Sequence, residues 1–394
     1  MKKLFFIAAI AGAALVSCTK NELAPSATEQ HEITFASPVT STLTKADLVT
    51  GTVYPTDIPF YVFADYHKTE FTSAEDFTSY MTNGGQGVLV QHTGPEIDKE
   101  GVDDEETLDT YWTSDTKYYW PMDGYLTFYA YSFGRSDYSA TLANHTYTPA
   151  NGLSITGYTI KTDLSNQCDL MLSSRVKDQQ KDDMAENNVI YDGVQIPFYH
   201  VLSAIQFAAC TDKDYSEDDY TITLKSLTVK NAYTQANLKQ FADAATDTPS
   251  NVWSNWGEEK NYTAFNGSWE VPVTTTTDTY TASVIQTSMD ADLIVLPQAL
   301  VHNTNEVIVE IVYTVSHPDM GTTGEGDEAV QNSIEYTKNF PLTVGDAENN
   351  KWLEGKRYIY SIIFGMEEIK FAPAIVEDWD DEGIEIEVPK DEIK

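Results

Sequence analysis

Long hydrophobic runs, cysteine and basic residues are all scarce in this chain of 394 residues. The apolar run from Leu4 to Leu15 cannot cross a hydrocarbon core, because a spanning helix needs about 20 apolar residues. Three cysteines are too few for a disulfide scaffold or a thiolate metal cluster. Only 24 Lys and Arg stand against 61 Asp and Glu, a formal charge of −37. Nucleic acid and anionic membrane surfaces would therefore repel the protein.

The N-terminus has the order of a bacterial secretion signal that ends in a lipobox. Lys2 and Lys3 give a positive start, the apolar run follows, and the small Ser17 precedes Cys18. We expect residues 1–17 to be a lipoprotein signal peptide and the mature chain to begin at an acylated Cys18. Two lipid anchors on that cysteine suffice for stable attachment to a membrane. The alternative is an ordinary signal peptide in which Cys18 is incidental.

Tyr, Thr and Val are abundant, and many short segments alternate apolar and polar residues between turn signals. This pattern predicts an all-β protein built from β-sandwiches rather than βαβ units. After strands near 32–35, 57–64 and 125–132, we expect further ones at 155–162, 194–209, 220–230, 269–274, 280–286, 292–297, 306–315, 334–343 and 357–365. The spacing of Ala236, Leu238, Phe241 and Ala245 also predicts one amphipathic helix over 232–245.

The length after the signal peptide suits two domains, with one long sandwich as the alternative. The polar stretch 177–188 predicts the boundary between them. The expected parts are a lipidated segment with the first strand, an N-terminal sandwich domain, a C-terminal sandwich domain and an acidic tail, at 18–45, 46–185, 186–379 and 380–394. Cys168 and Cys210 either pair or remain two separate buried thiols, and the second arrangement is favoured.

Catalytic and metal-binding motifs are missing from the sequence. Asp212, Asp214, Ser216 and Asp218 alternate as in a calcium loop, but Glu217 stands where that loop needs glycine. A solvated acidic turn is the better interpretation. The seven histidines are scattered singly, and no nucleophile elbow, phosphate loop or dinucleotide fingerprint occurs. We assign no metal, no cofactor and no catalytic residue, and an enzymatic function has no motif to support it.

Taken in order, several segments resemble the fimbrillin-like family of surface lipoproteins from Gram-negative anaerobes of the Bacteroides group. Besides the lipobox, the resemblance includes Glu32–Phe35, Thr44–Ala46, Val62–Ala64, Tyr119–Pro121, Leu126–Ser132, Asp169–Met171, Pro197–Phe207, Leu293–Gln298, Trp352–Gly365 and Val376–Trp379. It implies two tandem transthyretin-like β-sandwiches and a pilus subunit on the cell outer membrane, contributing to adhesion. The implied partners are other fimbrial subunits, outer-membrane lipid through Cys18, and a host protein or glycan, with no nucleic acid.

The resemblance also implies a mode of assembly. In the family, an Arg- or Lys-directed protease removes the first strand, and a strand from a neighbouring subunit fills the opened groove. Lys45, followed by Ala46, matches the cleavage position, so that cleavage would remove Ile33 and Phe35. The alternative is that Lys45 is an ordinary exposed lysine.

The tail departs from the family pattern, because fifteen residues follow Trp379. Ile384, Ile386 and Val388 occupy every second position and could refill the pockets of a missing strand, which makes the tail our candidate donor. Equally, 380–394 could form an edge strand of its own domain. An alternative function is a non-polymerising surface lipoprotein or tip adhesin that holds a host ligand through Trp112, Trp253 and Trp256. Tryptophan in a sandwich is more often part of the core.

Overall fold

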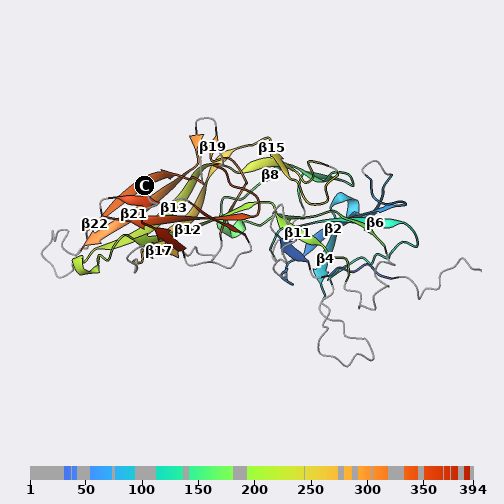
Figure 1. Cartoon of the computed structure of the whole chain (residues 1–394), viewed down its shortest axis with the longest axis horizontal. Coiled ribbons are helices and arrows are strands. Elements are labelled where there is room, and N and C mark those ends of the chain that lie inside the picture. The colour runs from blue at the N-terminus through green and yellow to red at the C-terminus, as the bar shows by residue number, and fades with distance from the viewer. Residues whose placement is uncertain are drawn as a thin grey trace, which may run out of the picture.

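A nine-stranded sheet lies in the N-terminal half of the computed structural model (Figure 1). Its order is β1 (Val39–Ser41), β11 (Pro197–His200), β9 (Met171–Ser173), β6 (Tyr125–Ser132), β2 (Phe60–His67), β4 (Val88–His92) and β5 (Trp112–Ser114), with β3 (Thr78–Met81) paired to β2 and β10 (Val176–Gln179) paired to β6. The structure describes residues 31–36, 38–41, 54–72, 76–93, 112–135, 142–180, 193–243, 245–273, 279–285, 292–302, 305–317, 332–344, 350–366, 368–372, 374–379 and 386–390.

Both faces of this sheet are buried, because its central strands carry apolar residues at successive positions. On β2, Phe60 and Val62 face one cluster of buried side chains, whereas Tyr61 and Phe63 face another. Successive residues of a strand point to opposite faces, so a nearly continuous apolar run is what a doubly covered strand requires.

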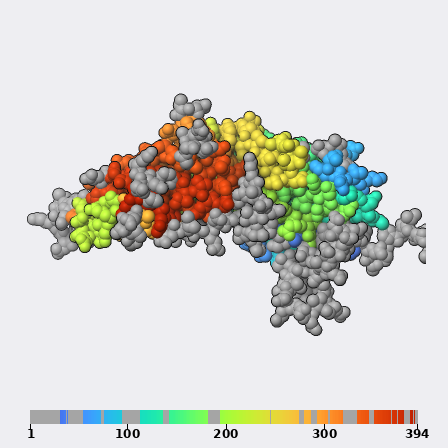
Figure 2. All heavy atoms as spheres, in the orientation of Figure 1, coloured from blue at the N-terminus to red at the C-terminus, as the bar shows by residue number. Residues whose placement is uncertain are grey.

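A four-stranded sheet covers one of these faces. Its order is β15 (Val252–Ser254), β14 (Gln235–Lys239), β8 (Gly152–Thr159) and β7 (His145–Thr148). Strand β14 therefore pairs with β8, which belongs to the first half of the chain, and β15 pairs with β14. In Figure 2 the yellow residues of this region lie beside green residues from the first half of the chain. The helix predicted over 232–245 is wrong, because this stretch forms the end of β13 (Thr221–Tyr233) and the strand β14.

Two further sheets pack together in the C-terminal half. One has the order β24 (Ile369–Phe371), β23 (Lys356–Phe364), β12 (Ser203–Thr211), β17 (Thr279–Val284) and β26 (Ile386–Pro389), with β18 (Leu293–Val295) paired to β12 and β25 (Ile375–Asp378) paired to β23. The other has the order β16 (Glu259–Glu270), β13, β21 (Ile308–His317) and β22 (Asn332–Pro341). A two-stranded hairpin of β19 (Val301–His302) and β20 (Asn305–Glu306) projects from this half (Figure 1).

The prediction of an all-β protein made of β-sandwiches is confirmed. Helical turns among the described residues are short 3-10 turns, namely η1 (Asn83–Gly85), η2 (Leu164–Asn166) and η4 (Ser216–Asp218). None of the helices in the described part of the chain is long and apolar enough to cross a membrane. The predicted domain boundary at 177–188 falls largely outside the described residues, and the boundaries stay a prediction.

A buried arginine fixes the loops of the four-stranded sheet to the nine-stranded one. The Arg175 guanidinium donates to the Tyr129 hydroxyl and to the carbonyl oxygens of Ala150 and Thr246, each at 2.9 Å. It also lies 4.6 Å from the ring centre of Phe241. These bonds satisfy the donors of a side chain that would otherwise be costly to bury.

A buried carboxyl group lies nearby on β2. Asp65 is 1% exposed and accepts a hydrogen bond from the Tyr147 hydroxyl on β7. Burial raises the pKa of Asp65 to about 6, and the bond from Tyr147 opposes part of this rise. The contact between the two sheets of the N-terminal half therefore contains a group that titrates near neutral pH.

Candidate functional site

The first-strand segment, residues 31–36, joins the two ends of the nine-stranded sheet. On one side the Ile33 amide donates to the Tyr118 carbonyl at 2.8 Å and the Phe35 amide donates to the Trp112 carbonyl at 2.9 Å. On the other side the Val194 amide donates to the Thr34 carbonyl at 2.9 Å, and the Ala36 amide donates to the Val194 carbonyl at 3.1 Å. Because Val194 leads into β11 and Trp112 begins β5, this segment closes the sheet into a barrel-like ring.

Two side chains of this segment fill the interior of the ring. Ile33 is 1% exposed and Phe35 is fully buried. The Phe35 ring meets the rings of Phe60 and Phe128 edge to face, with centroids 5.8 Å and 5.9 Å apart. Edge-to-face aromatic pairs contribute beyond their buried area, so Phe35 is a central element of this core. At the surface the ion pair of Lys117 with Glu32, at 2.8 Å, adds little.

A glycine next to Val194 allows the backbone there to lie close to the first-strand segment. Gly193 has a φ of +92°, and a Cβ atom at this position would lie 2.5 to 2.7 Å from backbone atoms of Phe35 and Ala36. Any other residue would displace the first-strand segment or strain its neighbour. Just beyond the segment, β1 pairs in parallel with β11, and the Tyr54 amide donates to the Pro38 carbonyl at 3.3 Å.

The C-terminal strand β26 lies at the edge of a sheet of its own half. It pairs antiparallel with β17, where Ile386 is opposite Ala282 and Val388 is opposite Tyr280. Ile386 and Val388 are buried at 2% and 5% exposure, whereas Glu387 is exposed. The described part of the tail, residues 386–390, thus occupies the edge position that the sequence offered as the alternative to a donor strand.

Other predicted residues fall into two groups. Cys18, Lys45, Ala46 and Ile384 lie outside the described residues, and their roles stay predictions. Among the aromatic residues suggested for ligand binding, Trp112 is fully buried in the core of the ring, so it is not an exposed platform. The Trp253 indole N–H donates to Glu354 at 2.5 Å, and Trp256 is 37% exposed.

Two smaller predictions concern polar and sulfur-containing groups. Cys210 is buried on β12, Cys168 is half-buried, and no disulfide joins them. Burial raises the pKa of the Cys210 thiol to about 12, so it is not a reactive thiolate. In the acidic turn, Asp214 accepts from the Ser216 amide at 2.8 Å and Asp212 accepts from the Tyr215 hydroxyl at 2.6 Å. Both carboxylates thus serve the geometry of their own loop.

Sequence analysis missed the residues that receive the first-strand segment, namely Trp112, Tyr118, Gly193 and Val194. The alternation of Val194, Ile196 and Phe198 was a usable signal, since all three are buried in the same cluster as Ile33 and Phe35. Together the fold and this site define an all-β protein whose first strand is inserted between two ends of a sheet and plugs its core.

The sequence matches the model of the fimbrillin-like family over residues 64–379, and the chain belongs to that family. Membership supports a cell-surface fimbrial subunit with other fimbrial subunits as partners, and gives no support to an enzyme. Among curated proteins, no sequence matches the chain.

Solved structures offer distant matches. A fimbrial protein from Bacteroides vulgatus is 18% identical, with a TM-score of 0.46, covering 88% of this chain and 99% of that one. A fimbrial assembly protein from Parabacteroides distasonis is 11% identical, with a TM-score of 0.34 and coverage of 90% and 97%. A fimbrilin from Porphyromonas gingivalis is 10% identical, also with a TM-score of 0.34, and coverage is 84% and 89%.

Proposed function

We propose that this protein is a fimbrial subunit lipoprotein that assembles by donor-strand exchange at the outer membrane. In this proposal the precursor is anchored through Cys18 and reaches the cell surface. Cleavage between Lys45 and Ala46 then releases the chain up to residue 45, and a strand from another subunit takes the place of the first-strand segment. The assembled fimbria contributes to adhesion.

One observation carries the proposal: the first-strand segment supplies the buried core side chains Ile33 and Phe35, and it lies on the N-terminal side of the proposed cleavage after Lys45. Backbone hydrogen bonds join Ile33 to Tyr118 and Phe35 to Trp112 on one side of the segment. On the other side they join Thr34 and Ala36 to Val194. Cleavage after Lys45 would also detach β1, which pairs with β11. Loss of both would leave open pockets beside unpaired backbone groups, an edge that favours addition of another strand.

The tail fits the chemistry of a replacement strand. Ile384, Ile386 and Val388 repeat at the same two-residue spacing as Ile33 and Phe35, so they could enter the same row of pockets. In the described part of the tail, Ile386 and Val388 belong to β26, which pairs with β17 over four residues, from Thr279 to Ala282. An edge strand of this length can leave its sheet without opening the two sheets that enclose the main core.

The experiment compares protease-induced polymerisation of four soluble chains. One chain carries Lys45→Gln and Lys20→Gln, one ends at Trp379, one carries the exposed control Lys68→Gln, and one is the parent. Donor-strand exchange predicts SDS-resistant ladders from the parent and the control, and folded monomers from the other two. Ladders of equal extent from all four chains would refute the mechanism.

Lipid attachment is tested separately in cells. Cys18→Ser should abolish incorporation of a clickable fatty acid and release the chain from the membrane fraction. Labelling that persists in this variant would contradict the anchor.

A second candidate function, glycan binding, is favoured by one exposed aromatic pair. The Trp256 ring stacks on the Tyr233 ring with centroids 5.6 Å apart, and Trp256 is 37% exposed. A flat aromatic face at the surface can stack on a sugar ring. Binding of the monomer on a glycan array, lost in Trp256→Ala, would support an adhesin, and equal binding by the variant would exclude this site.

A further inference from the structure

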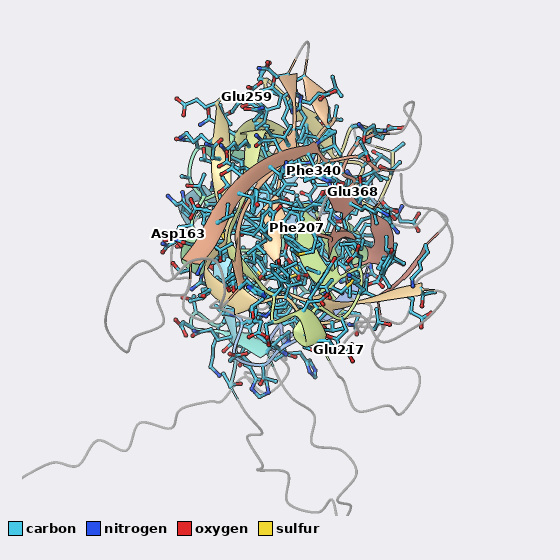
Figure 3. The ribbon with its side chains drawn as sticks, turned by 90° about the vertical axis from the view of Figure 1, so that its left-hand side faces the viewer. Asp163, Phe207, Glu217, Glu259, Phe340 and Glu368 are labelled. Carbon is cyan, nitrogen blue, oxygen red and sulfur yellow. The ribbon has the colours of Figure 1, made fainter. Side chains whose placement is uncertain are left out.

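Strand β22 is a long edge strand in the part of the chain that the structure describes. Among the described strands β22 has one partner, β21, with which it pairs over ten residues from Asn332 to Pro341. Its side chains from Ser333 to Asn339 are exposed. Figure 3 looks towards this end of the molecule, where Phe340 is labelled. A free edge of this length presents a row of unpaired backbone groups to a further strand.

One face of β22 carries Ile334, Tyr336 and Phe340 together with Lys338, and it continues the face of the sheet that packs in the core. Ile334 and Tyr336 lie opposite Val315 and Tyr313, which are both buried. Nevertheless Ile334 is 46% exposed and Tyr336 is 37% exposed. The sheet therefore extends beyond its covering layer, and its last strand leaves apolar area in water that another strand could cover.

We propose that β22 pairs with β22 of a second copy of this chain, antiparallel across a two-fold axis through Thr337. The two four-stranded sheets would then form one continuous sheet of eight strands. This inference is independent of donor-strand exchange, because it uses neither the first-strand segment nor the tail.

The strand's own sequence selects this register. Directly opposite residues of an antiparallel pair lie on the same face of the sheet. A two-fold axis must therefore place one residue opposite its own copy, and we name each register by that residue. An axis through Glu335 or Lys338 would set like charges opposite each other, which is unfavourable. An axis through Tyr336 would set the apolar Ile334 against Lys338.

An axis through Thr337 gives complementary pairs throughout. The opposite pairs are then Thr337 with itself, Tyr336 with Lys338, Glu335 with Asn339, and Ile334 with Phe340, each heterologous pair occurring twice. These are a cation against an aromatic ring, a carboxylate against an amide, and two apolar side chains. The second copy is thus the occupant whose chemistry this edge matches.

The expected dimer is weak in dilute solution. A junction between two edge strands buries less than the about 1,200 Å² typical of stable interfaces, and each copy carries a formal charge of −37. Salt screens this long-range repulsion, so association should strengthen as ionic strength rises. An interface held by surface ion pairs would weaken instead.

The first test uses sedimentation equilibrium of the full mature chain with Cys18→Ser and Lys45→Gln, changes that remove lipid and the proposed cleavage. Asn339→Glu sets the new carboxylate opposite Glu335 at two places and should lower the association constant about fivefold. Adding Glu335→Lys to this variant places opposite charges together and should restore association. The matched control is Asn266→Glu on β16, the other edge of the same sheet, which should leave association unchanged.

The second test introduces one additional cysteine at the two-fold axis. Thr337→Cys in the same background should form a covalent dimer under mild oxidation, because the two sulfur atoms would be opposite each other, whereas Ser268→Cys on β16 should not. A parent that stays monomeric at all concentrations and salt levels would overturn the proposal. So would a dimer that Asn339→Glu leaves intact, or one that Glu335→Lys fails to restore.

Discussion

Replacing Phe35 by alanine tests how much the first-strand segment contributes to the fold. Phe35 is fully buried and contacts the edges of Phe60 and Phe128, so the substitution leaves a cavity in the ring. Truncation of a buried phenylalanine costs about 3–5 kcal/mol of unfolding free energy. For a structure of 150–250 residues, each kcal/mol lowers Tm by about 2–4 °C. We therefore expect Tm of the N-terminal half to fall by about 10 °C.

Calorimetry of the uncleaved chain measures this change, and hydrogen exchange shows where it acts. Amides of residues 31–36 should exchange faster in Phe35→Ala, while β21 and β13 keep their protection. The matched control is Glu32→Gln, which removes only the exposed ion pair with Lys117 and should cost less than about 1 kcal/mol. If Phe35→Ala costs no more than this control, Phe35 does not plug the core and the reasoning is refuted.

Three further substitutions probe the surroundings of the ring. Gly193→Ala should destabilise the chain by about 2 kcal/mol or more and speed exchange at 31–36, because the new Cβ would overlap the backbone of Phe35; unchanged exchange would contradict the close approach. Arg175→Lys should lower the free energy of unfolding, measured in urea, by about 3 kcal/mol, because lysine cannot reproduce the planar guanidinium that reaches three acceptors. A decrease below about 0.5 kcal/mol would exclude this role. Asp65 has a folded-state pKa of about 6 against an ordinary 3.8, so the folded protein holds more protons between these values and stability falls as pH rises through that window. Asp65→Asn keeps an acceptor for Tyr147, and it should remove this dependence and stabilise the chain at pH 7 by about 1–3 kcal/mol; an unaltered pH profile would show that the carboxyl is not the source.

Strands buried on both faces were predictable from sequence, because apolar residues at successive positions identify them. The segment 125–132 coincides with β6, and the segment 57–64 contains the first five residues of β2. The helix over 232–245 failed for a specific reason. The true period is two, with Ala236, Leu238 and Gln240 all buried, but a polar glutamine concealed it. Gln240 is satisfied inside because its amide accepts from Leu153 N–H at 2.9 Å and donates to the Ser173 carbonyl at 2.7 Å.

Edge strands were harder to predict. The sequence indicated a strand at 269–274, whereas β16 runs from Glu259 to Glu270. Its residues are mostly polar and exposed, and apolar alternation along this strand is therefore weak. The candidate site was likewise predictable only in part. Local alternation identified Ile33 and Phe35, but their partners Trp112 and Val194 lie far along the chain and come together only through long-range pairing.

Strands β13 and β14 follow each other with only Thr234 between them, so one extended stretch of backbone passes from the C-terminal half into the N-terminal half. In a filament pulled from both ends, tension would travel along this stretch. On one side of Thr234 it would load the ladder of β13 with β21, and on the other the ladder of β14 with β8. A pull along these strands would shear the hydrogen bonds of both ladders together rather than open them one after another. At this junction the two ladders would thus share the load, and the force needed to separate the halves would depend on both.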